Sequence, residues 1–288
     1  MAIKNLHTYY ERMESSLGDK VKIVDNVKSG NILEVGFVSG SLLKVLDELG
    51  NDVFGIDNSI DSVNLALTNG LDNVFLGDAN DIEKVFKGQM FDTIIFCSMI
   101  HEVFSSERNK HTESPLYMAN LQGALKVNQL LEQAYKLLKD DGKIIIRDGL
   151  KVPIEKEKNL TTFTLKNDEL FMLDDYRNFH FNKEMQFNLT KKNNNETLIS
   201  CGLNDAMEFL YTYTWGKDSM EHERQERYGF LSLSSYMLLL ESIGFENVNG
   251  VSYLQSGYIE NLEKVEFLDL SDVSDKLPDS NMILVGRK

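Results

Sequence analysis

The sequence has few of the residues that mark a cross-linked or membrane-spanning protein. Its two cysteines, Cys97 and Cys201, lie far apart in 288 residues and outside any CxxC spacing, which argues against a disulfide framework and a cysteine-rich metal site. No apolar run approaches the roughly 18 residues that cross a bilayer. The start of the chain also lacks the basic and then apolar layout of a signal peptide. We therefore expect a cytoplasmic protein with no membrane partner and two buried thiols.

Positive charge is scarce as well. The chain has 30 Lys and Arg against 45 Asp and Glu, a net charge of −15. Non-specific binding to nucleic acid depends on basic residues that neutralise phosphates, so bulk DNA is disfavoured as a partner. RNA stays open, because aromatic side chains can hold a terminal or flipped nucleotide without an extensive basic surface. At 42% hydrophobic residues, the chain is long enough to bury a large core.

Short apolar runs alternate with amphipathic segments over the first half of the chain, which predicts strands alternating with helices. The predicted strands are Asn31–Val35, Asp52–Ile56, Val74–Leu76, Phe91–Cys97 and Lys143–Arg147, and the predicted helices are Ser41–Leu49, Ile60–Asn69, Asp81–Phe86 and Leu116–Leu138. Parallel strands need helical crossovers and are buried on both faces. The pattern therefore predicts an α/β fold with a doubly wound sheet.

The two ends and one long middle segment depart from this alternation. Residues 1–29 carry apolar positions at helical spacing, which predicts one or two helices. Residues 151–230 mix predicted strands ("TTFTL", "FNLT…ETLI") with a helix around residues 204–212, which predicts an inserted α+β segment. Residues 231–245 predict a helix capped by serines and ended by Gly244. Two more strands follow without a full helical crossover, so we expect the last strand of a seven-stranded sheet to be antiparallel.

A glycine turn, "EVGFVSG" over residues 34–40, joins the first strand to its helix. Such a turn lets a ligand lie against backbone N–H groups at the positive end of the helix. A dinucleotide would use G-x-G-x-x-G there, which is absent, and Glu34 would repel a pyrophosphate. The turn favours a ligand that carries an ammonium or sulfonium group. An NAD-dependent oxidoreductase, whose ribose-binding acid would fit, remains an alternative.

Two further acids follow strands of the predicted sheet. Asp57 ends the second strand 23 residues after Glu34, where an acid can accept hydrogen bonds from both hydroxyls of an unphosphorylated ribose. Asp78 follows the third strand; it could also simply cap the next helix. Ligands bind open α/β sheets at the carboxyl ends of the strands. Adenosine with a charged amino-acid tail fits these three acids better than a dinucleotide does.

Four stretches in order, "ILEVGFVSG", "FGID", "GDA" and "FDTIIFCSMIHEV", resemble the successive motifs of class I S-adenosylmethionine-dependent methyltransferases. The resemblance covers approximately residues 20–150 and 231–288. It implies a Rossmann-like core over residues 30–150 and 231–288, with S-adenosyl-L-methionine as cofactor and residues 151–230 as a substrate-recognition insertion or lid. The positions that it implies at the cofactor are Glu34, Gly36, Val38, Gly40, Asp57, Asn58, Asp78, Ala79, Cys97 and Ser98.

The resemblance also implies what these positions do. Glu34 and Gly36 would lie near the methionine amino group, and Gly40 at the helix start. Asp57 would bind the ribose and Asp78-Ala79 the adenine, while Cys97-Ser98 would line the wall beside the sulfonium. The departure is Val38, where the family usually has glycine; its side chain would narrow the pocket or shift the turn. A catalytically silent relative that binds a partner is therefore a further alternative.

Three residues near the ends of the fourth and fifth strands are the candidates for catalysis. His101 and Glu102 follow the fourth strand, and histidine can take a proton from an attacking hydroxyl or amine near neutral pH. The alternative is a histidine that packs at the start of the next helix. Asp148, after Arg147 on the same edge, would orient a substrate or simply end its strand. We expect His101, Glu102 and Asp148 to be catalytic, with His101 as the base.

Aromatic residues concentrate in one part of the insertion, "YTYTWGKDSMEHERQERYG". Above the site they would exclude water and stack a planar or cationic substrate; ordinary core packing is the alternative. We expect no metal here, because no second histidine lies at helical ligand spacing from His222, and a solvated, charged helix around it. The candidate substrate residues are Tyr211, Tyr213, Trp215, His222 and Tyr228.

The sequence as a whole predicts methyl transfer to an oxygen or nitrogen of a small molecule or a protein side chain. The chain has no N-P-P-Y motif after the fourth strand and no Pro-Cys pair, which disfavours DNA adenine and cytosine methylases. An RNA methyltransferase, an NAD-dependent oxidoreductase and a silent binding protein remain the alternatives. The acceptor and the oligomeric state are left open.

Overall fold

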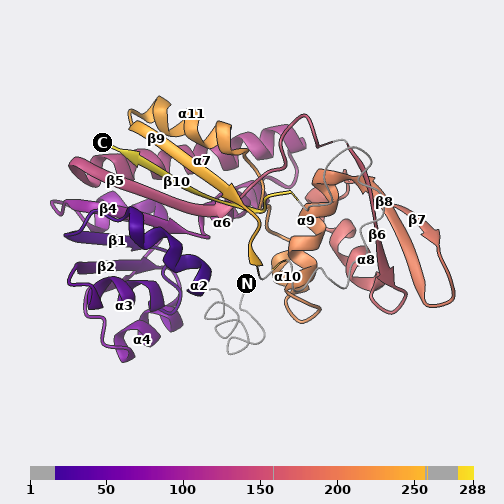
Figure 1. Cartoon of the computed structure of the whole chain (residues 1–288), viewed down its shortest axis with the longest axis horizontal. Helices are drawn as coiled ribbons and strands as arrows, with labels where there is room; N and C mark the ends of the chain where they lie inside the picture. The colour runs from indigo at the N-terminus through magenta and orange to yellow at the C-terminus, as the bar shows by residue number, and fades with distance from the viewer. Residues whose placement is uncertain (1–16, 158, 257, 259–277) are drawn as a thin grey trace.

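The large sheet has the strand order β3-β2-β1-β4-β5-β10-β9 in the computed structural model, which describes residues 17–157, 159–256, 258 and 278–288 (Figure 1). The strands are β1 (Asn31–Val35), β2 (Asp52–Asp57), β3 (Val74–Leu76), β4 (Phe91–Cys97), β5 (Leu138–Gly149), β9 (Glu246–Tyr253) and β10 (Asn281–Arg287). β10 runs antiparallel to both β5 and β9, and the other pairs are parallel. The doubly wound α/β fold and its antiparallel last strand are confirmed.

Helices cover both faces of this sheet. One face carries α2 (Leu17–Lys20), the 3-10 helix η1 (Val21–Asn26), α3 (Ser41–Glu48) and α4 (Ile60–Thr68), and the other carries η2 (Ala79–Asp81), α5 (Ile82–Val85), α6 (Ile100–Arg108), η3 (Asn109–His111), α7 (Leu116–Leu137) and α11 (Leu233–Ile243). None of the helices within the described ranges has the length and apolar character needed to span a membrane.

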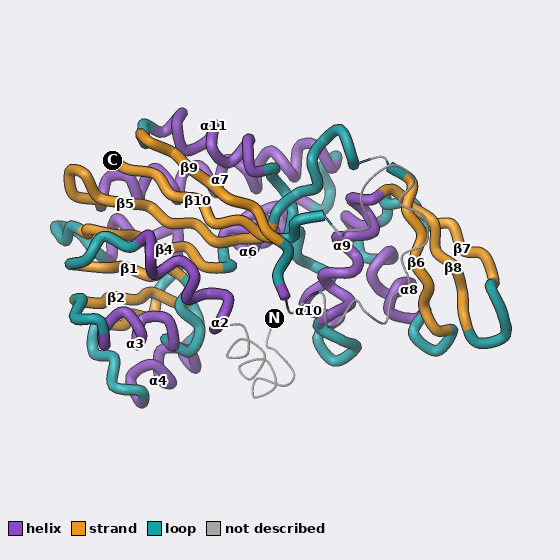
Figure 2. Tube along the Cα trace, viewed as in Figure 1, coloured by secondary structure: helices purple, strands orange, loops and turns teal. Residues whose placement is uncertain are grey.

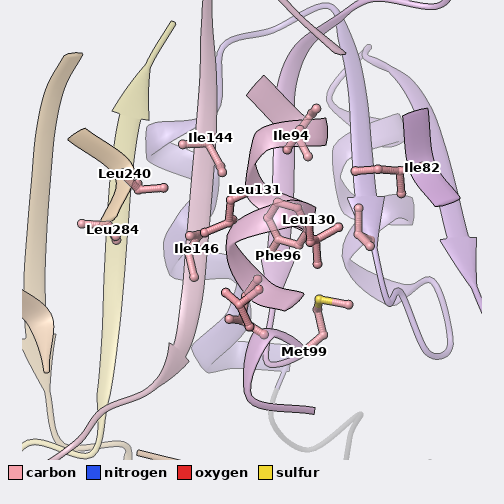
Figure 3. Packing of buried hydrophobic residues seen from close by; sticks show 14 of the residues in the cluster. Ile82, Ile94, Phe96, Met99, Leu130, Leu131, Ile144, Ile146, Leu240 and Leu284 are labelled. Carbon is pink, nitrogen blue, oxygen red and sulfur yellow. The ribbon is translucent and has the colours of Figure 1, made fainter. Parts of the chain in front are cut away.

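The core lies in two layers because the central strands are apolar on both sides. Ile94 and Phe96 of β4 point into the layer under α7, where they meet Leu130 and Leu131 (Figure 3). Ile95, the residue between them, belongs to the opposite layer, which is formed with α3 and η1. Successive side chains of a strand alternate between faces, so a continuous apolar run fills both layers. This rigid centre fixes where the strand ends lie.

The starts and ends of two helices follow the expected capping chemistry. The Ser59 side chain accepts the Ser62 N–H at the start of α4, and the Ser232 side chain accepts the Ser235 N–H at the start of α11. α11 ends at Gly244, whose φ of 116° lies in the left-handed region. Helix α6, whose start at Met99 has no side-chain cap, was not among the predicted helices. The predicted fifth strand ended at Arg147, whereas pairing with β10 extends β5 to Gly149.

Residues 151–230 build a second, smaller sheet. It has the antiparallel order β6-β8-β7, formed by β6 (Leu160–Lys166), β7 (Asn188–Lys191) and β8 (Glu196–Gly202), with helices α8 (Leu170–Asn178), η4 (His180–Asn182), α9 (Leu203–Thr214) and α10 (Met220–Glu223). Figure 2 shows these elements beyond the carboxyl end of β5. The segment therefore lies next to the edge where the sheet is expected to bind its ligand.

The helices predicted near the N-terminus lie partly within the described residues, and both cysteines lie wholly within them. The helical pattern expected over residues 1–29 is present at residues 17–26 as α2 and η1, while residues 1–16 lie outside the described residues. Cys97 and Cys201 are both free and buried, as expected. Cys97 belongs to the core layer of the large sheet and Cys201 to the core of the insertion.

Candidate functional site

The glycine turn after β1 alternates residues in the left-handed region. Gly36, Val38 and Gly40 have φ values of 75°, 54° and 77°. A Cβ atom on Gly36 would lie 3.1 Å from the Cβ of Met99, which follows β4, so the close approach of these two segments requires glycine. Val38 is a β-branched residue in a conformation that side chains disfavour. This backbone conformation explains why the methyltransferase motif usually has glycine at its position.

Asp57, at the end of β2, holds this turn in place. Its Oδ2 accepts the Val38 N–H at 3.0 Å, and its Oδ1 accepts the Ser59 N–H at 2.9 Å. Burial raises the pKa of Asp57, and the two backbone hydrogen bonds oppose that rise. A carboxylate oxygen can accept about two hydrogen bonds. The Ser62 side chain also hydrogen-bonds to this carboxylate, so three of about four acceptor positions are taken and one remains for a ribose hydroxyl.

Glu34, in β1, is a buried carboxyl without a hydrogen-bond partner on one oxygen. The residue is 3% exposed, and its Oε2 contacts no donor among the described residues. Burial raises its pKa to about 8; Lys20 opposes the rise and Asp57 adds to it. An isolated buried carboxyl is costly. Its position at a ligand-binding edge fits a cofactor that brings an ammonium group.

The remaining cofactor candidates lie after β2, β3 and β4. Asn58 is exposed beside Asp57, and Asp78 is exposed at the start of η2, which begins with Ala79. Asp78 accepts hydrogen bonds from the backbone and the side chain of Asn80 at 2.8 and 2.7 Å. Asp78 thus makes the helix-capping contact that the alternative interpretation predicted. Its contact with the adenine of a cofactor stays a prediction.

Cys97 and Ser98 end β4 beside a buried arginine. Burial raises the pKa of the Cys97 thiol, and Ser98 has a φ of 58°. The Ser98 hydroxyl accepts a hydrogen bond from Arg147, which also donates to Asp19 of α2. Arg147 is only 2% exposed. Buried charges need partners, and Asp19 supplies one from a segment 128 residues away.

His101, in the first turn of α6, lies between two carboxylates. Its Nδ1 is 2.5 Å from Asp148 Oδ1, and its Nε2 is 3.3 Å from Glu226 Oε2. Burial disfavours the charged ring, but the attraction of Asp148 and Glu226 outweighs burial and raises the pKa of His101 well above its usual value. The structure thus brings two of the three catalytic candidates together. The third, Glu102, is exposed on α6.

The comparisons with known proteins agree with this geometry. A family model described as a methyltransferase domain matches residues 33–146. This part of the chain, from β1 to β5, is therefore similar to a methyltransferase domain. The unpartnered Glu34 carboxyl and the remaining acceptor capacity of Asp57 would suit the ammonium group and the ribose of S-adenosylmethionine.

Among the solved structures that share the fold of this chain are two methyltransferases. A SAM-dependent methyltransferase from Archaeoglobus fulgidus is 12% identical with a TM-score of 0.52, and the match covers 95% of this chain and 94% of that one. Haemonchus contortus phospholethanolamine N-methyltransferase 2, solved with phosphomonomethylethanolamine and S-adenosylhomocysteine, is 14% identical with a TM-score of 0.50, and the match covers 94% and 52%. At these identities the likeness concerns the fold. A search of curated proteins found no match.

A loop of the insertion lies against α6. The Arg227 N–H donates to Ser105 Oγ at 2.8 Å, and the Gln225 carbonyl accepts from Arg108 Nη2 at 3.2 Å and from Asn109 Nδ2 at 3.0 Å. Glu226 lies between these two anchors and reaches His101. The loop of residues 224–227, which we call the anchor loop, therefore connects the insertion to the candidate catalytic histidine.

The segment around His222 is not the solvated helix that the sequence predicted. Glu223 is 3% exposed and accepts a hydrogen bond from the Tyr228 hydroxyl, and His222 Nε2 is 3.4 Å from Glu226 Oε1. Burial raises the pKa of Glu223 to about 8. The hydrogen bond to Glu226 raises the pKa of His222 to about 9. The prediction was wrong because α8 and α9 of the insertion pack against this segment, and Tyr228 covers Glu223.

The aromatic candidates divide between two places. The Tyr228 ring centroid lies 4.9 Å from that of His101 and 6.0 Å from that of Tyr211, and Trp215 packs against the same cluster. Tyr213 packs instead on Phe209 in the core of the insertion. Tyr211 and Tyr228 are buried, as the core-packing alternative predicted. Of the five candidate substrate residues, Tyr228 lies beside the His101 ring, and His222 contacts Glu226, which also contacts His101.

Sequence reasoning missed two residues that shape the site. Glu226 bridges His101 and His222, and its pKa falls to about 2 because their hydrogen bonds outweigh burial. The four-residue spacing from His222 was a visible signal, since such residues meet on a helix. Asp19 gave no signal, because its partner Arg147 is distant in sequence. Among the described residues no group of three His, Cys, Asp or Glu side chains could hold a metal ion.

Proposed function

We propose that the protein transfers the methyl group of S-adenosylmethionine to an oxygen or nitrogen of a small molecule or a protein side chain. The observation that carries this proposal is the buried pair of His101 and Asp148, with a nitrogen-to-oxygen distance of 2.5 Å. It lies at the carboxyl ends of β4 and β5, on the edge that also holds Glu34 and Asp57. A histidine in this place gives the acceptor a group that handles its proton.

Some residues of the site would bind the cofactor, and others would handle the proton that the acceptor loses. When bound, S-adenosylmethionine supplies a methyl group that its positive sulfur already activates. The chain therefore contributes mainly alignment, which can lower a reaction barrier by several kcal/mol. Glu34 would hold the ammonium end and Asp57 the ribose, while Gly36 and Gly40 allow the turn to approach the cofactor closely. Asp78-Ala79 would border the adenine.

His101 can act as a base only if Asp148 orients its ring and the contact between its Nε2 and Glu226 is broken. Asp148 holds Nδ1, which orients the ring and leaves Nε2 toward Glu226. With both carboxylates in place the ring keeps its proton, because its pKa is raised. An acceptor that replaces Glu226 at Nε2 removes one of the two anions and lowers the pKa of the ring. The ring then releases its Nε2 proton to Glu226 or to solvent, and the neutral Nε2 accepts the proton that the acceptor loses.

The net charge of the chain and the contacts of the insertion with His101 both support the proposed class of acceptor. The net charge of −15 opposes binding of long polyanions. Residues 151–230 would recognise the acceptor, because the anchor loop and Tyr228 of this segment reach His101. A cytoplasmic setting belongs to the same proposal, and the two free cysteines support it.

Transfer of labelled methyl groups tests this function. Purified protein, S-adenosylmethionine labelled on the methyl group and fractionated lysate from the source cells should give label in one small-molecule or protein fraction. His101→Gln should lower the rate by about 10²- to 10⁴-fold, the usual contribution of a general base, without weakening cofactor binding. His111→Gln is the matched control, since His111 pairs only with Glu107 at the surface. Unchanged activity of His101→Gln would exclude the base, and label in RNA alone would exclude the proposed acceptor class.

A further inference from the structure

The His101 ring is held as a cation by the carboxylates on its two sides. Its Nδ1 lies 2.5 Å from Asp148 Oδ1, and its Nε2 lies 3.3 Å from Glu226 Oε2. Because a carboxylate only accepts hydrogen bonds, both ring nitrogens carry a proton in this arrangement. The Tyr228 ring, whose centroid is 4.9 Å from that of His101, adds an aromatic face that favours positive charge. The site thus already surrounds one cation with two anions and a tyrosine.

The two arginines of the anchor loop are paired within the insertion. Arg224 forms an ion pair with Asp175 of α8, and Arg227 Nε lies 3.7 Å from Glu208 Oε2 of α9. Between them, Glu226 is the charged residue of this loop that reaches the ring in α6. The loop therefore separates its charges, because its cations pair with acids of the insertion while its anion is directed to the histidine.

The described groups around the ring balance in charge. His222 Nε2 lies 3.4 Å from the second oxygen of Glu226, and this contact raises the pKa of His222 to about 9. Two carboxylates, Asp148 and Glu226, thus face two imidazolium rings. Glu223 adds little charge near neutral pH, because burial raises its pKa to about 8. The exposed fraction of the side chains rises from 0% at Asp148 to 13% at Glu226 and 34% at His222, so solvent lies on the His222 side.

Use of His101 as a base disturbs this balance. The ring must first lose its Nε2 proton, which leaves two buried carboxylates with one remaining cation. A buried carboxylate without a partner is unfavourable. An ammonium group that enters between Nε2 and Glu226 restores the balance, because it can donate one N–H to the ring and another to the carboxylate. A neutral alcohol brings no such charge, and a phenolate or carboxylate brings a further anion.

We propose that the methyl acceptor carries a primary or secondary ammonium group, which binds between His101 and Glu226, and that its nitrogen receives the methyl group. This inference deepens the proposed function and rests on it. The ring releases its Nε2 proton to solvent and then takes one proton from the ammonium. The freed lone pair of the nitrogen bonds to the methyl carbon, while the carbon–sulfur bond breaks and leaves its electron pair on the sulfur. The product is again a cation, with one methyl group more.

The position of the transferred methyl group tests this inference. The full chain, S-adenosylmethionine labelled on the methyl group and fractionated lysate should give a labelled product that a cation exchanger retains. Fragmentation in a mass spectrometer should place the label on nitrogen. Label on oxygen would overturn the inference and leave the proposed function intact. Label in no fraction would mean that the proposed function fails together with the inference.

Glu226→Gln tests whether this carboxylate binds the ammonium. The probes are the amine identified by the labelling and its analogue with a hydroxyl in place of the amino group. Calorimetry near pH 7 should show that the unmodified chain binds the amine at least about 10-fold more tightly than the analogue. Glu226→Gln should weaken amine binding by about 10- to 100-fold and binding of the analogue by less than about threefold, as loss of one charge-assisted hydrogen bond implies.

Asp218→Asn is the matched control in the same segment. Asp218 is exposed, so this variant loses the same charge away from the His101 ring, and the ratio of the two affinities should stay at the value of the unmodified chain. Equal weakening of both ligands by Glu226→Gln would mean that Glu226 only holds the anchor loop in place. An unchanged amine affinity would remove Glu226 from the acceptor site. Either result overturns the inference.

Discussion

At Val38 the turn forces a β-branched side chain into the left-handed region, with φ at 54°. A side chain in this region costs about 1–2 kcal/mol, yet the conformation is retained because it directs the Val38 N–H to Asp57. The carboxylate that would bind ribose is thus oriented by a strained residue. Sequence comparison with the family motif points only to a missing glycine, whereas the structure shows that the turn keeps its geometry without it.

Glycine at this position should relieve the strain. We expect Val38→Gly to raise the free energy of unfolding by at most about 1 kcal/mol, because relief of the left-handed strain exceeds the added entropy cost of glycine. Urea unfolding measures this change. Val38→Ala is the control, since it shortens the side chain but keeps the Cβ atom that causes the strain. A glycine variant no more stable than the alanine variant would show that the turn is not strained.

Between elements, the anchor loop and α6 form the contact that decides the state of His101. Glu226 shares its two oxygens between His101 and His222, while Ser105 and Arg108 of α6 hold the loop on either side. Because neither element supplies the whole arrangement, the pKa of His101 depends on how the insertion docks. Movement of the loop would thus change the proton affinity of the candidate base.

Removing the charge of Glu226 tests this dependence. We expect Glu226→Gln to lower the pKa of His101, since Asp148 alone then stabilises the charged ring, and to speed hydrogen exchange in residues 216–230. Histidine NMR titration and exchange mass spectrometry measure the two effects. Asp218→Asn, an exposed site in the same segment, loses the same charge and should change neither. An unaltered His101 titration in Glu226→Gln would mean that Asp148 alone sets the pKa.

For the molecule as a whole, several buried groups titrate far from their usual values. Glu34 and Glu223 have pKa values of about 8, above the usual value of 4.5, so the folded state binds more protons than the unfolded state between those values. His222, with a pKa of about 9, stabilises the fold below pH 6.5 and loses this contribution as the pH rises through 9. Glu226, with a pKa of about 2, stabilises the fold above pH 4.5 and loses this contribution in acid.

These shifts predict a stability maximum on the acid side of neutrality. The free energy of unfolding should be greatest near pH 4.5 and should fall by roughly 2 kcal/mol or more by pH 9, because stability declines wherever the folded state binds more protons. Urea unfolding at pH 6 and pH 9 measures the fall. Glu34→Gln removes one titrating group and should reduce it. A stability that is flat or rises up to pH 9 would contradict the buried, uncompensated carboxyls.

The local patterns predicted the sheet but not the pairing of its charged residues. The apolar run of β4 and the turn around Gly36 were assigned correctly, since burial on both faces and tight turns impose local residue requirements. The environment of Glu223 was predicted incorrectly, because a charged residue has the same local signature whether water or another segment covers it. The role of the aromatic cluster remained ambiguous for the same reason: Tyr228 packs in the core and also lies next to His101.

The sequence by itself determined the positions of the strands, the antiparallel last strand and the acids at the strand ends, because hydrophobic periodicity and turn chemistry act over a few neighbouring residues. Only the tertiary structure decided that Asp19 pairs with Arg147 and that Glu226 meets His101. Such pairings join residues that are widely separated along the chain. They form because a buried charge is stable only where folding brings it a partner.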